Sequence, residues 1–333
     1  MKIIVDAMGG DNAPLEVLKG CALYKKENDI DFVLTGKKEA IEQIIADEKL
    51  DLGNYEIVHT DDVISMEDEP TRVIKDKKES SLGKAFSLLK QGYGDAVVSA
   101  GSTGAVLVGA TMTVGRIRGI KRPALATVMP GDNGPTMLMD CGANVECRPE
   151  MLVQFGIMGS VYMNKIQNVD NPRVMLANVG TEDTKGGPLQ KEAFELLKKA
   201  PVNFCGNIEG RDLLASVADV VVADGFSGNL ILKTCEGVAG MMYANLKQVF
   251  KKNFVSKLAA AMVMSGLKVF KKKMDYTEYG GAPLMGIAKP VIKAHGSSNA
   301  VAFKNALRQA VEYHNNNVIS EIQTSIAQLK EVE

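Results

Sequence analysis

Short apolar runs alternate along the chain with turns rich in glycine and polar residues, and then with stretches of helical spacing. The apolar runs are nearly continuous and rich in β-branched residues, which is typical of strands covered on both faces. Strands that alternate with helices predict a largely parallel sheet between two helical layers, a three-layer α/β/α fold. The expected strands are Lys2–Met8, Asp31–Leu34, Tyr55–His59, Asp95–Ala100, Thr136–Asp140, Arg173–Asn178 and Ala218–Ala223.

The predicted fold is one unit with a protruding helical segment. No linker rich in proline, glycine or serine divides the chain, and no short repeat recurs at a fixed period. We therefore expect a single α/β catalytic domain over residues 1–333, with residues 240–275 forming a hairpin-like helical excursion within it.

Within the excursion, one stretch has an amphipathic pattern. Its apolar stripe at helical spacing and its lysine-rich opposite face would suit an anionic membrane surface or an acidic partner protein. An ordinary amphipathic helix that packs on the core or in a dimer contact has the same pattern, so the alternatives stay open. The residues that define the two faces are Val255, Leu258, Met262, Lys257, Lys268, Lys271 and Lys272.

Composition and charge narrow the environment and the partners. The formal net charge is −1, so no global field attracts nucleic acid, and a nucleic-acid partner is not expected. Five cysteines form no CxxC pair, which is typical of reduced thiols in a cytosolic protein. No stretch approaches the roughly 20 apolar residues of a membrane span. We expect a cytoplasmic protein.

Small and polar residues follow several of the expected strands. In open α/β sheets, ligands bind beyond the carboxyl ends of the strands, where helix N-termini and glycine turns can hold anions. Each residue alone could instead be an N-cap, but paired glycines suggest that a ligand approaches the backbone. The candidates for substrate or phosphate binding are Gly9, Gly10, Asp11, Asn12, Ser102, Thr103, Gly104, Asn144 and Ser227, with Asn229 beside them as a catalytic candidate.

Two further segments carry candidate chemistry. His295 lies in a loop with the hydroxyls of Ser297 and Ser298, directly before an expected helix, so a functional role competes with a structural one. Lys185 lies in a stretch dense in glycine and polar residues and is the most prominent of the cationic candidates, although a solvated loop lysine has the same appearance.

Several standard sites are missing from the sequence. There is no GxxxxGK[ST] loop, no GxGxxG after the first strand, no GxSxG elbow and no HExxH. A P-loop kinase, a dinucleotide enzyme and a serine hydrolase are therefore disfavoured. No tight set of metal ligands is evident, and we expect neither a metal nor a cofactor.

Taken together, the motifs resemble the PlsX family of phosphate acyltransferases. The blocks occur in family order from residue 6 to residue 300, and none departs from the family pattern. They are Asp6–Asp11 with Ala13-Pro14, Ser99–Ala105, Asp140–Asn144, Asn178–Glu182, Gly206–Asp212, Ala223–Asn229, Tyr279–Leu284 and His295–Ser298.

The resemblance implies transfer of a fatty acyl group from acyl carrier protein to inorganic phosphate, which gives acyl phosphate for phospholipid synthesis. It also implies an isopropylmalate-dehydrogenase-like sheet, a homodimer, and peripheral association with the membrane where the next membrane acyltransferase of the pathway uses the product. The lysine-rich helix fits either the membrane or the acidic carrier protein.

This chemistry agrees with the missing motifs, because phosphate is itself a nucleophile and attacks a thioester without a catalytic triad. The enzyme has to align the two groups and stabilise an oxyanion. We expect Ser102, Thr103 and the Gly9–Asn12 turn to hold one anionic group. The residues expected to complete the pocket are Asn144, Lys185, Asn229, His295 and Ser297.

Two alternatives remain from the sequence. A metal- and NAD-dependent decarboxylating dehydrogenase shares the architecture, but the clustered arginines and aspartates that it needs are not found. A non-enzymatic membrane-surface scaffold would use the Phe254–Met274 helix alone, which leaves the glycine-rich turns unexplained.

Overall fold

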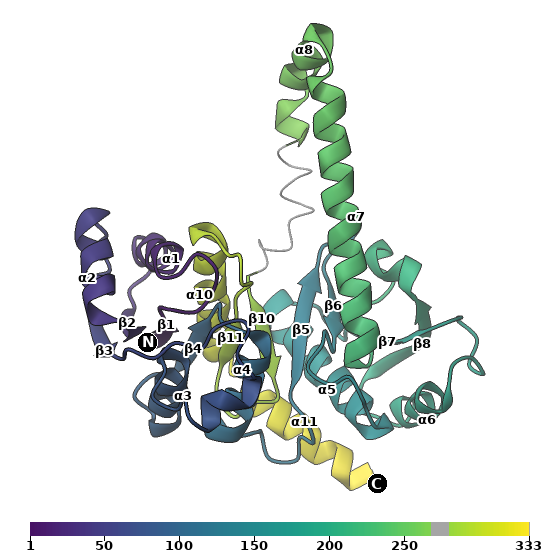
Figure 1. Ribbon diagram of the computed structural model, residues 1–333. Helices are drawn as coiled ribbons and strands as arrows, with labels where there is room; N and C mark the ends of the chain where they lie inside the picture. Colours follow the sequence, from purple (N-terminus) through teal and green to yellow (C-terminus); the bar gives the residue numbers. More distant parts are fainter. Residues whose placement is uncertain (268–279, 333) are drawn as a thin grey trace.

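The computed structural model describes residues 1–267 and 280–332 and contains one 11-stranded sheet with helices on both faces (Figure 1). In chain order the strands are β1 (Lys2–Asp6), β2 (Asp31–Gly36), β3 (Tyr55–His59), β4 (Ala96–Ser99), β5 (Ala124–Met129), β6 (Thr136–Met139), β7 (Arg173–Asn178), β8 (Asn203–Glu209), β9 (Val220–Val222), β10 (Ala282–Met285) and β11 (Val291–Lys293). The α-helices are α1 (Leu15–Lys25), α2 (Lys38–Asp47), α3 (Ser81–Gln91), α4 (Thr103–Gly109), α5 (Pro149–Gln167), α6 (Pro188–Leu197), α7 (Gly225–Lys251), α8 (Phe254–Met262), α10 (Ala300–Asn315) and α11 (Val318–Val332). Shorter turns are the 3₁₀ helices η1 (Pro70–Ile74) and η3 (Gly210–Ala215) and the π-helix η2 (Ala110–Val114).

The sheet is mostly parallel, but its direction reverses in the middle. The strand order is β3-β2-β1-β4-β11-β10-β5-β6-β9-β7-β8. Seven of these ten pairs are parallel, and the three central pairs β11–β10, β10–β5 and β5–β6 are antiparallel. Three reversals in succession leave β1–β4 running opposite to β6–β9. The predicted three-layer α/β class is confirmed.

A largely parallel sheet would place all the strand-to-helix turns along one edge, and because of this reversal they lie along two. The turns after β1 and β4 lie at one edge, and those after β6, β7 and β9 lie at the other. The central strands β10 and β11 have only four and three residues, so these edges are close together at the centre. Turns from both edges can therefore meet over the same short stretch of sheet.

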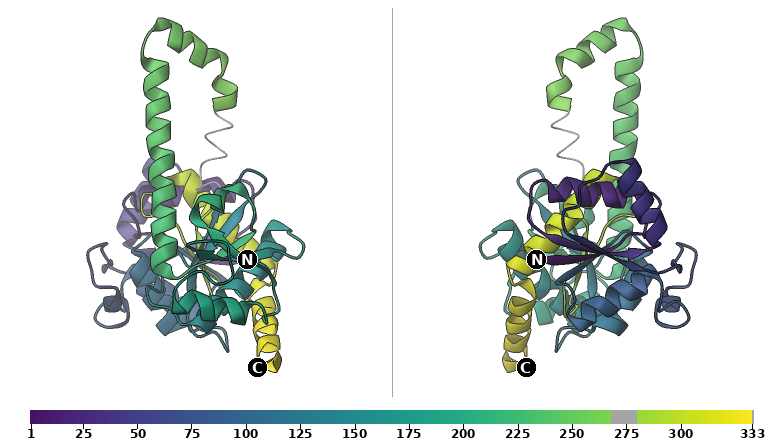
Figure 2. Two further views of the ribbon diagram at one scale, coloured as in Figure 1. Left: turned by 90° about the vertical axis from the view of Figure 1, so that its right-hand side faces the viewer. Right: turned by 90° about the vertical axis from the view of Figure 1, so that its left-hand side faces the viewer.

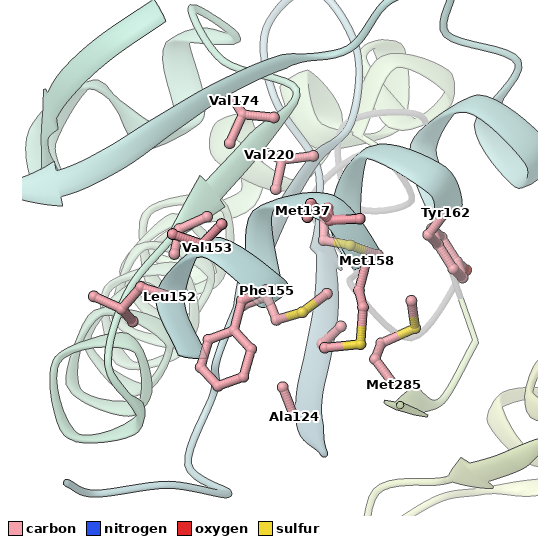
Figure 3. Packing of buried hydrophobic residues seen from close by; sticks show 14 of the residues in the cluster. Ala124, Met137, Leu152, Val153, Phe155, Met158, Tyr162, Val174, Val220 and Met285 are labelled. Carbon is pink, nitrogen blue, oxygen red and sulfur yellow. The ribbon is translucent and has the colours of Figure 1, made fainter. Parts of the chain in front are cut away.

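Helix α5 shows how one face of the sheet is covered (Figure 3). Its side chains Phe155, Met158 and Tyr162 are buried against residues of β5, β6, β7 and β9 in one apolar cluster. Close approach is possible because Gly159 faces the sheet, where an added Cβ would lie 2.5 Å from a methyl of Val220. The opposite face is covered by α3, α4 and the start of α7. Helices α1 and α10 pack with strands β1, β2 and β4 in a separate apolar cluster.

Helix α7 leaves the body of the protein and carries α8 at its far end (Figures 1 and 2). It has 27 residues and is therefore about 40 Å long. Its buried residues Gly225, Gly228 and Leu232 all lie in the first eight positions, and no residue of α8 is buried. The excursion predicted over 240–275 includes the outer part of this arm, whereas its residues 268–275, with Lys268, Lys271 and Lys272, lie outside the described residues. In the described part of the chain, no helix is both long and apolar enough to cross a membrane.

Candidate functional site

Three loops that are distant in sequence pack against one another at the carboxyl ends of β1, β4 and β11. The backbone N–H of Asp11 donates to the carbonyl of Gly296 over 2.8 Å. The side-chain amide of Asn12 donates to the carbonyls of Ser297 and Ser298, at 3.2 and 3.3 Å. Gly10 has φ of +104° and leaves no room for a side chain, since a Cβ would lie 2.9 Å from that of Ala100. The structure thus brings together three of the turns selected from the sequence.

A buried carboxylate fixes the base of these loops. Asp6 ends β1 with 1% of its surface exposed, and Ser99 Oγ donates to its Oδ2 over 2.7 Å. The N–H of Gly101 in turn donates to Ser99 Oγ over 3.0 Å. Burial raises the pKa of Asp6, and the donated hydrogen bonds from hydroxyls and from the backbone oppose that rise. Gly9 packs directly on this group, because a Cβ there would lie 2.5 Å from Asp6 Oδ2.

A pocket of about 400 Å³ opens beside these loops, over the antiparallel centre of the sheet. Its lining residues belong to strands and turns of both directions, because the short central strands bring the two edges of the sheet close together. One part of its wall is polar or charged, and another part is apolar. Its lining residues are Asp11, Met66, Thr103, Leu125, Thr127, Val128, Cys141, Gly142, Asn229, Leu232, Lys233, Glu236, Gly280, Gly281, Ala282, Lys293, Ala294, His295 and Gly296.

Two lysines face this pocket. Lys293, the last residue of β11, is only 6% exposed. Desolvation lowers its pKa from 10.5 to about 8, and nearby Asp11 and Asp6 offset part of that fall. Lys233 of α7 is half exposed and pairs with Glu236 at 2.8 Å. The pocket also holds the carboxylates of Asp11 and Glu236, so Lys293, which forms no ion pair among the described residues, is the cation best suited to an anionic ligand.

His295 lines the same pocket as a polar donor. The backbone N–H of Ser297 donates to its Nδ1 over 3.3 Å, and Ser297 Oγ lies 2.9 Å from the same nitrogen. A nitrogen that accepts an amide N–H carries no proton, so the neutral ring holds its proton on Nε2. Burial lowers the pKa of His295, and Lys233 and Lys293 lower it further by repulsion. The neutral imidazole is therefore the favoured form.

Of the residues at the start of α7, Asn229 faces the pocket whereas Ser227 has a structural partner. Asn229 lines the pocket next to Gly142, whose added Cβ would lie 3.5 Å from the Asn229 side chain. Asp224 is the N-cap of α7 and accepts hydrogen bonds from the N–H and the hydroxyl of Ser227, at 2.9 and 2.8 Å. The hydroxyl of Ser227 is thus engaged in capping the helix.

Asn144 also has a structural position. Its side-chain amide donates to the carbonyl of Pro123 at 2.8 Å and to Asp140 Oδ2 at 2.9 Å. Asp140 is fully buried and also accepts from three backbone N–H groups, those of Leu125, Ala143 and Asn144. Burial raises the pKa of Asp140, and these donors oppose the rise. The Asp140–Asn144 pair ties the turn after β6 to the start of β5, and Asn144 does not line the pocket.

The remaining predicted residues lie around the pocket or away from it. Ser102 is the half-buried N-cap residue of α4 and makes no side-chain capping bond. Gly104 faces Pro70 of η1, where a Cβ would lie 2.6 Å from the ring. Lys185 lies in the loop between β7 and α6, where its side chain is 48% exposed and 3.7 Å from Glu182. Lys185 does not line the pocket.

Sequence reasoning missed two residues that line the pocket, Lys293 and Met66. Lys233, one of the cationic candidates from the sequence, also lines it, and Asp6 at the end of the first strand supports its loops together with Ser99. A usable signal existed for Lys293, because a lone lysine between Val291-Ile292 and Ala294 interrupts an apolar run directly before His295. Met66 carries no such signal, since it comes from a polar stretch far from the other lining residues in sequence.

These features define an α/β protein with a lysine-containing pocket over the centre of its sheet, and solved structures share the fold. A phosphotransacetylase from Streptococcus pyogenes superposes with a TM-score of 0.62 at 17% identity, covering 96% of this chain and 94% of that one. The EutD phosphotransacetylase from Staphylococcus aureus has a TM-score of 0.60 at 14% identity, covering 98% and 94%.

Sequence comparison is more specific. The model of a family described as "Fatty acid synthesis protein" matches residues 1–321. A phosphate acyltransferase from Thermoanaerobacterium thermosaccharolyticum is 48% identical over 326 residues, covering 98% of this chain and 97% of that protein. A phosphate acyltransferase from Alkaliphilus oremlandii is 46% identical over 329 residues, covering 99% and 98%. The chain belongs to the phosphate acyltransferase family, which confirms the resemblance stated from its motifs, and it is an acyl-group transferase.

Proposed function

We propose that the protein transfers a fatty acyl group from acyl carrier protein to inorganic phosphate and releases acyl phosphate for phospholipid synthesis. The pocket carries this proposal, because cationic groups at Lys293 and Lys233 lie beside an apolar wall that includes Leu125, Val128 and Leu232. A phosphate and the first carbons of an acyl chain need these two surfaces side by side. Membership of the phosphate acyltransferase family supports the same reaction class.

In the proposed step, a phosphate oxygen attacks the carbonyl carbon of the thioester. A C–O bond forms, the C–S bond breaks, and the sulfur leaves as a thiolate that takes up a proton from solvent. Because phosphate is already anionic at neutral pH, the protein has to align the reactants and to stabilise the oxyanion. The Nε2–H of neutral His295 and the side-chain amide of Asn229 are the proposed donors to that oxyanion.

Lys185 is proposed as a third catalytic group, although it does not line the pocket. Its loop is largely exposed and its ion pair with Glu182 is long, at 3.7 Å, so little holds the side chain in its present place. A catalytic role for Lys185 needs this loop to move, or it needs the lysine to serve the pocket of a second copy.

The assay combines protein, acyl carrier protein thioester and phosphate, and it traps acyl phosphate with hydroxylamine. Lys185→Ala and His295→Ala should each lower acyl-phosphate formation at least tenfold. Lys191→Ala and His314→Ala are matched controls on exposed helical positions and should leave the rate within about twofold. Near-normal rates for both test variants would remove these residues from the mechanism. Absence of acyl phosphate with the unaltered protein would refute the proposed function.

We also propose that the protein is a homodimer that associates peripherally with anionic membrane, where the next membrane acyltransferase uses the product. The apolar side chains of α8 support the membrane contact, because Val255, Leu258 and Met262 are 74%, 52% and 86% exposed. Leu258→Glu should release the protein from anionic vesicles. Ser256→Glu adds the same charge on the opposite face of α8 and should leave binding in place. Unchanged binding of Leu258→Glu would favour a dimer contact instead.

The other functions considered from the sequence have less support. A scaffold without turnover is wrong, because the chain belongs to a family of acyltransferases. A decarboxylating dehydrogenase predicts NADH formation from malate-type acids in the presence of magnesium. We expect none under conditions in which acyl phosphate forms.

A further inference from the structure

Lys293 is a buried cation whose charge is poorly compensated by the protein. Its Nζ donates to two backbone carbonyls, those of Ala100 at 3.4 Å and of Ala294. Among the residues that the structure describes, none of the carboxylates forms an ion pair with it. Carbonyl oxygens accept hydrogen bonds but supply no full negative charge. The ammonium nevertheless faces the pocket, where a ligand can reach it.

The charged and titratable groups around Lys293 come from β1, from the turn after β1, from α7 and from the loop after β11. Asp6 at the end of β1 and Asp11 in the following turn attract its charge, and Lys233 of α7 repels it. Glu236 of α7 is paired with Lys233, and His295 in the next turn of the chain is neutral in its favoured form. Asp6 is itself engaged by the hydroxyl of Ser99. A buried charge without a close partner is costly, so this site favours a ligand that brings negative charge.

We propose that Lys293 is the principal binding group for the phosphate acceptor, with Lys233, which lines the same pocket, as the second cation. This assignment rests on the proposed function in taking phosphate as the substrate. A phosphate dianion compensates the charge of Lys293, which lacks an ion pair in the described chain, whereas the oxyanion of the reacting thioester carries one charge and exists only briefly. Thr103 borders the same space, so its hydroxyl can donate to one of the remaining phosphate oxygens.

The test compares Lys293→Met with Lys289→Met. Lys289 is a matched control four residues earlier, because it is partly buried and donates to the carbonyl of Leu89 at 2.8 Å without lining the pocket. Inorganic phosphate should raise the Tm of the unaltered protein and of Lys289→Met, since a ligand that binds only the folded state stabilises it. Lys293→Met should lose that response. Its KM for phosphate should rise at least tenfold, while its KM for the acyl donor changes less than threefold.

The Tm without phosphate separates binding from a structural role. Removing a poorly compensated buried charge should leave the Tm of Lys293→Met equal to or above that of the unaltered protein. A structural lysine would instead give a lower Tm and an intact response to phosphate. If Lys293→Met fails to fold, the ¹³Cε resonance of Lys293 in the unaltered chain gives a second measurement. This resonance is assigned by its loss in Lys293→Arg, and it should move when phosphate is titrated in. A resonance that stays in place at saturating phosphate overturns the proposal.

The outcomes also distinguish this assignment from the reaction itself. If acyl phosphate forms normally and Lys293→Met keeps both its response to phosphate and its phosphate KM, the assignment is wrong and the proposed function stands. If the unaltered protein forms no acyl phosphate but Lys293→Met loses the response to phosphate, the proposed function is wrong and the binding site stands.

Discussion

Replacing Asn144 with alanine tests whether this residue supports the fold or binds substrate. The sequence placed Asn144 among the pocket residues, whereas the structure engages its amide with Pro123 O and Asp140 Oδ2. Losing a hydrogen bond to a buried charged acceptor costs about 1.5–3 kcal/mol, and losing one to a carbonyl costs about 0.5–1.5 kcal/mol. Asp140 retains three backbone donors, so the pair should not collapse. The expected loss in the free energy of unfolding is therefore about 2–4 kcal/mol.

Calorimetry and steady-state kinetics give the two readouts for this variant. At about 1.4 °C per kcal/mol for a chain of this size, the Tm should fall by about 3–6 °C. The folded fraction, assayed well below its Tm, should keep a KM for phosphate within about twofold of the unaltered value. Asn315→Ala, at the exposed end of α10, is the control and should change stability by less than about 0.5 kcal/mol. A Tm that does not change, together with a tenfold loss of activity, would refute the structural interpretation and place Asn144 in the substrate pocket.

Two further predictions concern α7 and the pH dependence of the pocket. Gly228→Ala should lower the Tm steeply or prevent folding, because the added Cβ would lie 1.9 Å from the carbonyl oxygen of Asp140. The control Gly237→Ala, on the same helix, meets nothing within 4 Å and should stabilise the protein by about 0.5–1 kcal/mol. Equal melting curves for the two variants would contradict this packing. Folding lowers the pKa of Lys293 from 10.5 to about 8. Between these two pH values the unfolded chain therefore binds more protons than the folded one. The free energy of unfolding of the unaltered protein, compared with that of Lys293→Met, should rise with pH across that window. Over the same range the phosphate KM of the unaltered protein should increase as the ammonium is lost, and a KM that stays constant from pH 7 to 10 would argue against this pKa.

The sequence was sufficient for the fold class because its long strands carry clear patterns. The expected strands near residues 2, 31, 55, 95, 136, 173 and 218 all correspond to strands of the sheet. Strand direction was not accessible in the same way. The strands missed at the centre, β10 and β11, have four and three residues, and β10 contains Pro283, which is typical of an edge strand or of no strand at all. Strand β5, at the centre, and strand β8, at the edge, were missed as well, and the reversal occurs at the pairs β11–β10, β10–β5 and β5–β6.

The candidate site was predicted best where glycines and hydroxyls cluster next to a strong strand. The turns Gly9–Asn12 and Gly101–Gly104 and the loop from His295 to Ser298 do meet, because all three follow strands that run in the same direction. Asn144 and Ser227 also follow strands, but their side chains are engaged in a carboxylate bond and a helix cap. A single sequence does not distinguish a polar side chain that faces a ligand from one that faces its own backbone.

The reversal of the sheet also explains why a lysine can be buried in this pocket. A wholly parallel sheet would place every helix N-terminus along one edge, and the anion would then be bound mainly by backbone N–H groups. Here the turns after β6 and β9 approach from the opposite edge, and α7 contributes Asn229 and Lys233, its fifth and ninth residues. The short strand β11 ends within the pocket and contributes Lys293 directly from the sheet. Under the proposed assignment, side-chain cations add to the positive end of α4, whose first residue Thr103 borders the pocket, and a charge carried by a titrating lysine would make phosphate binding depend on pH.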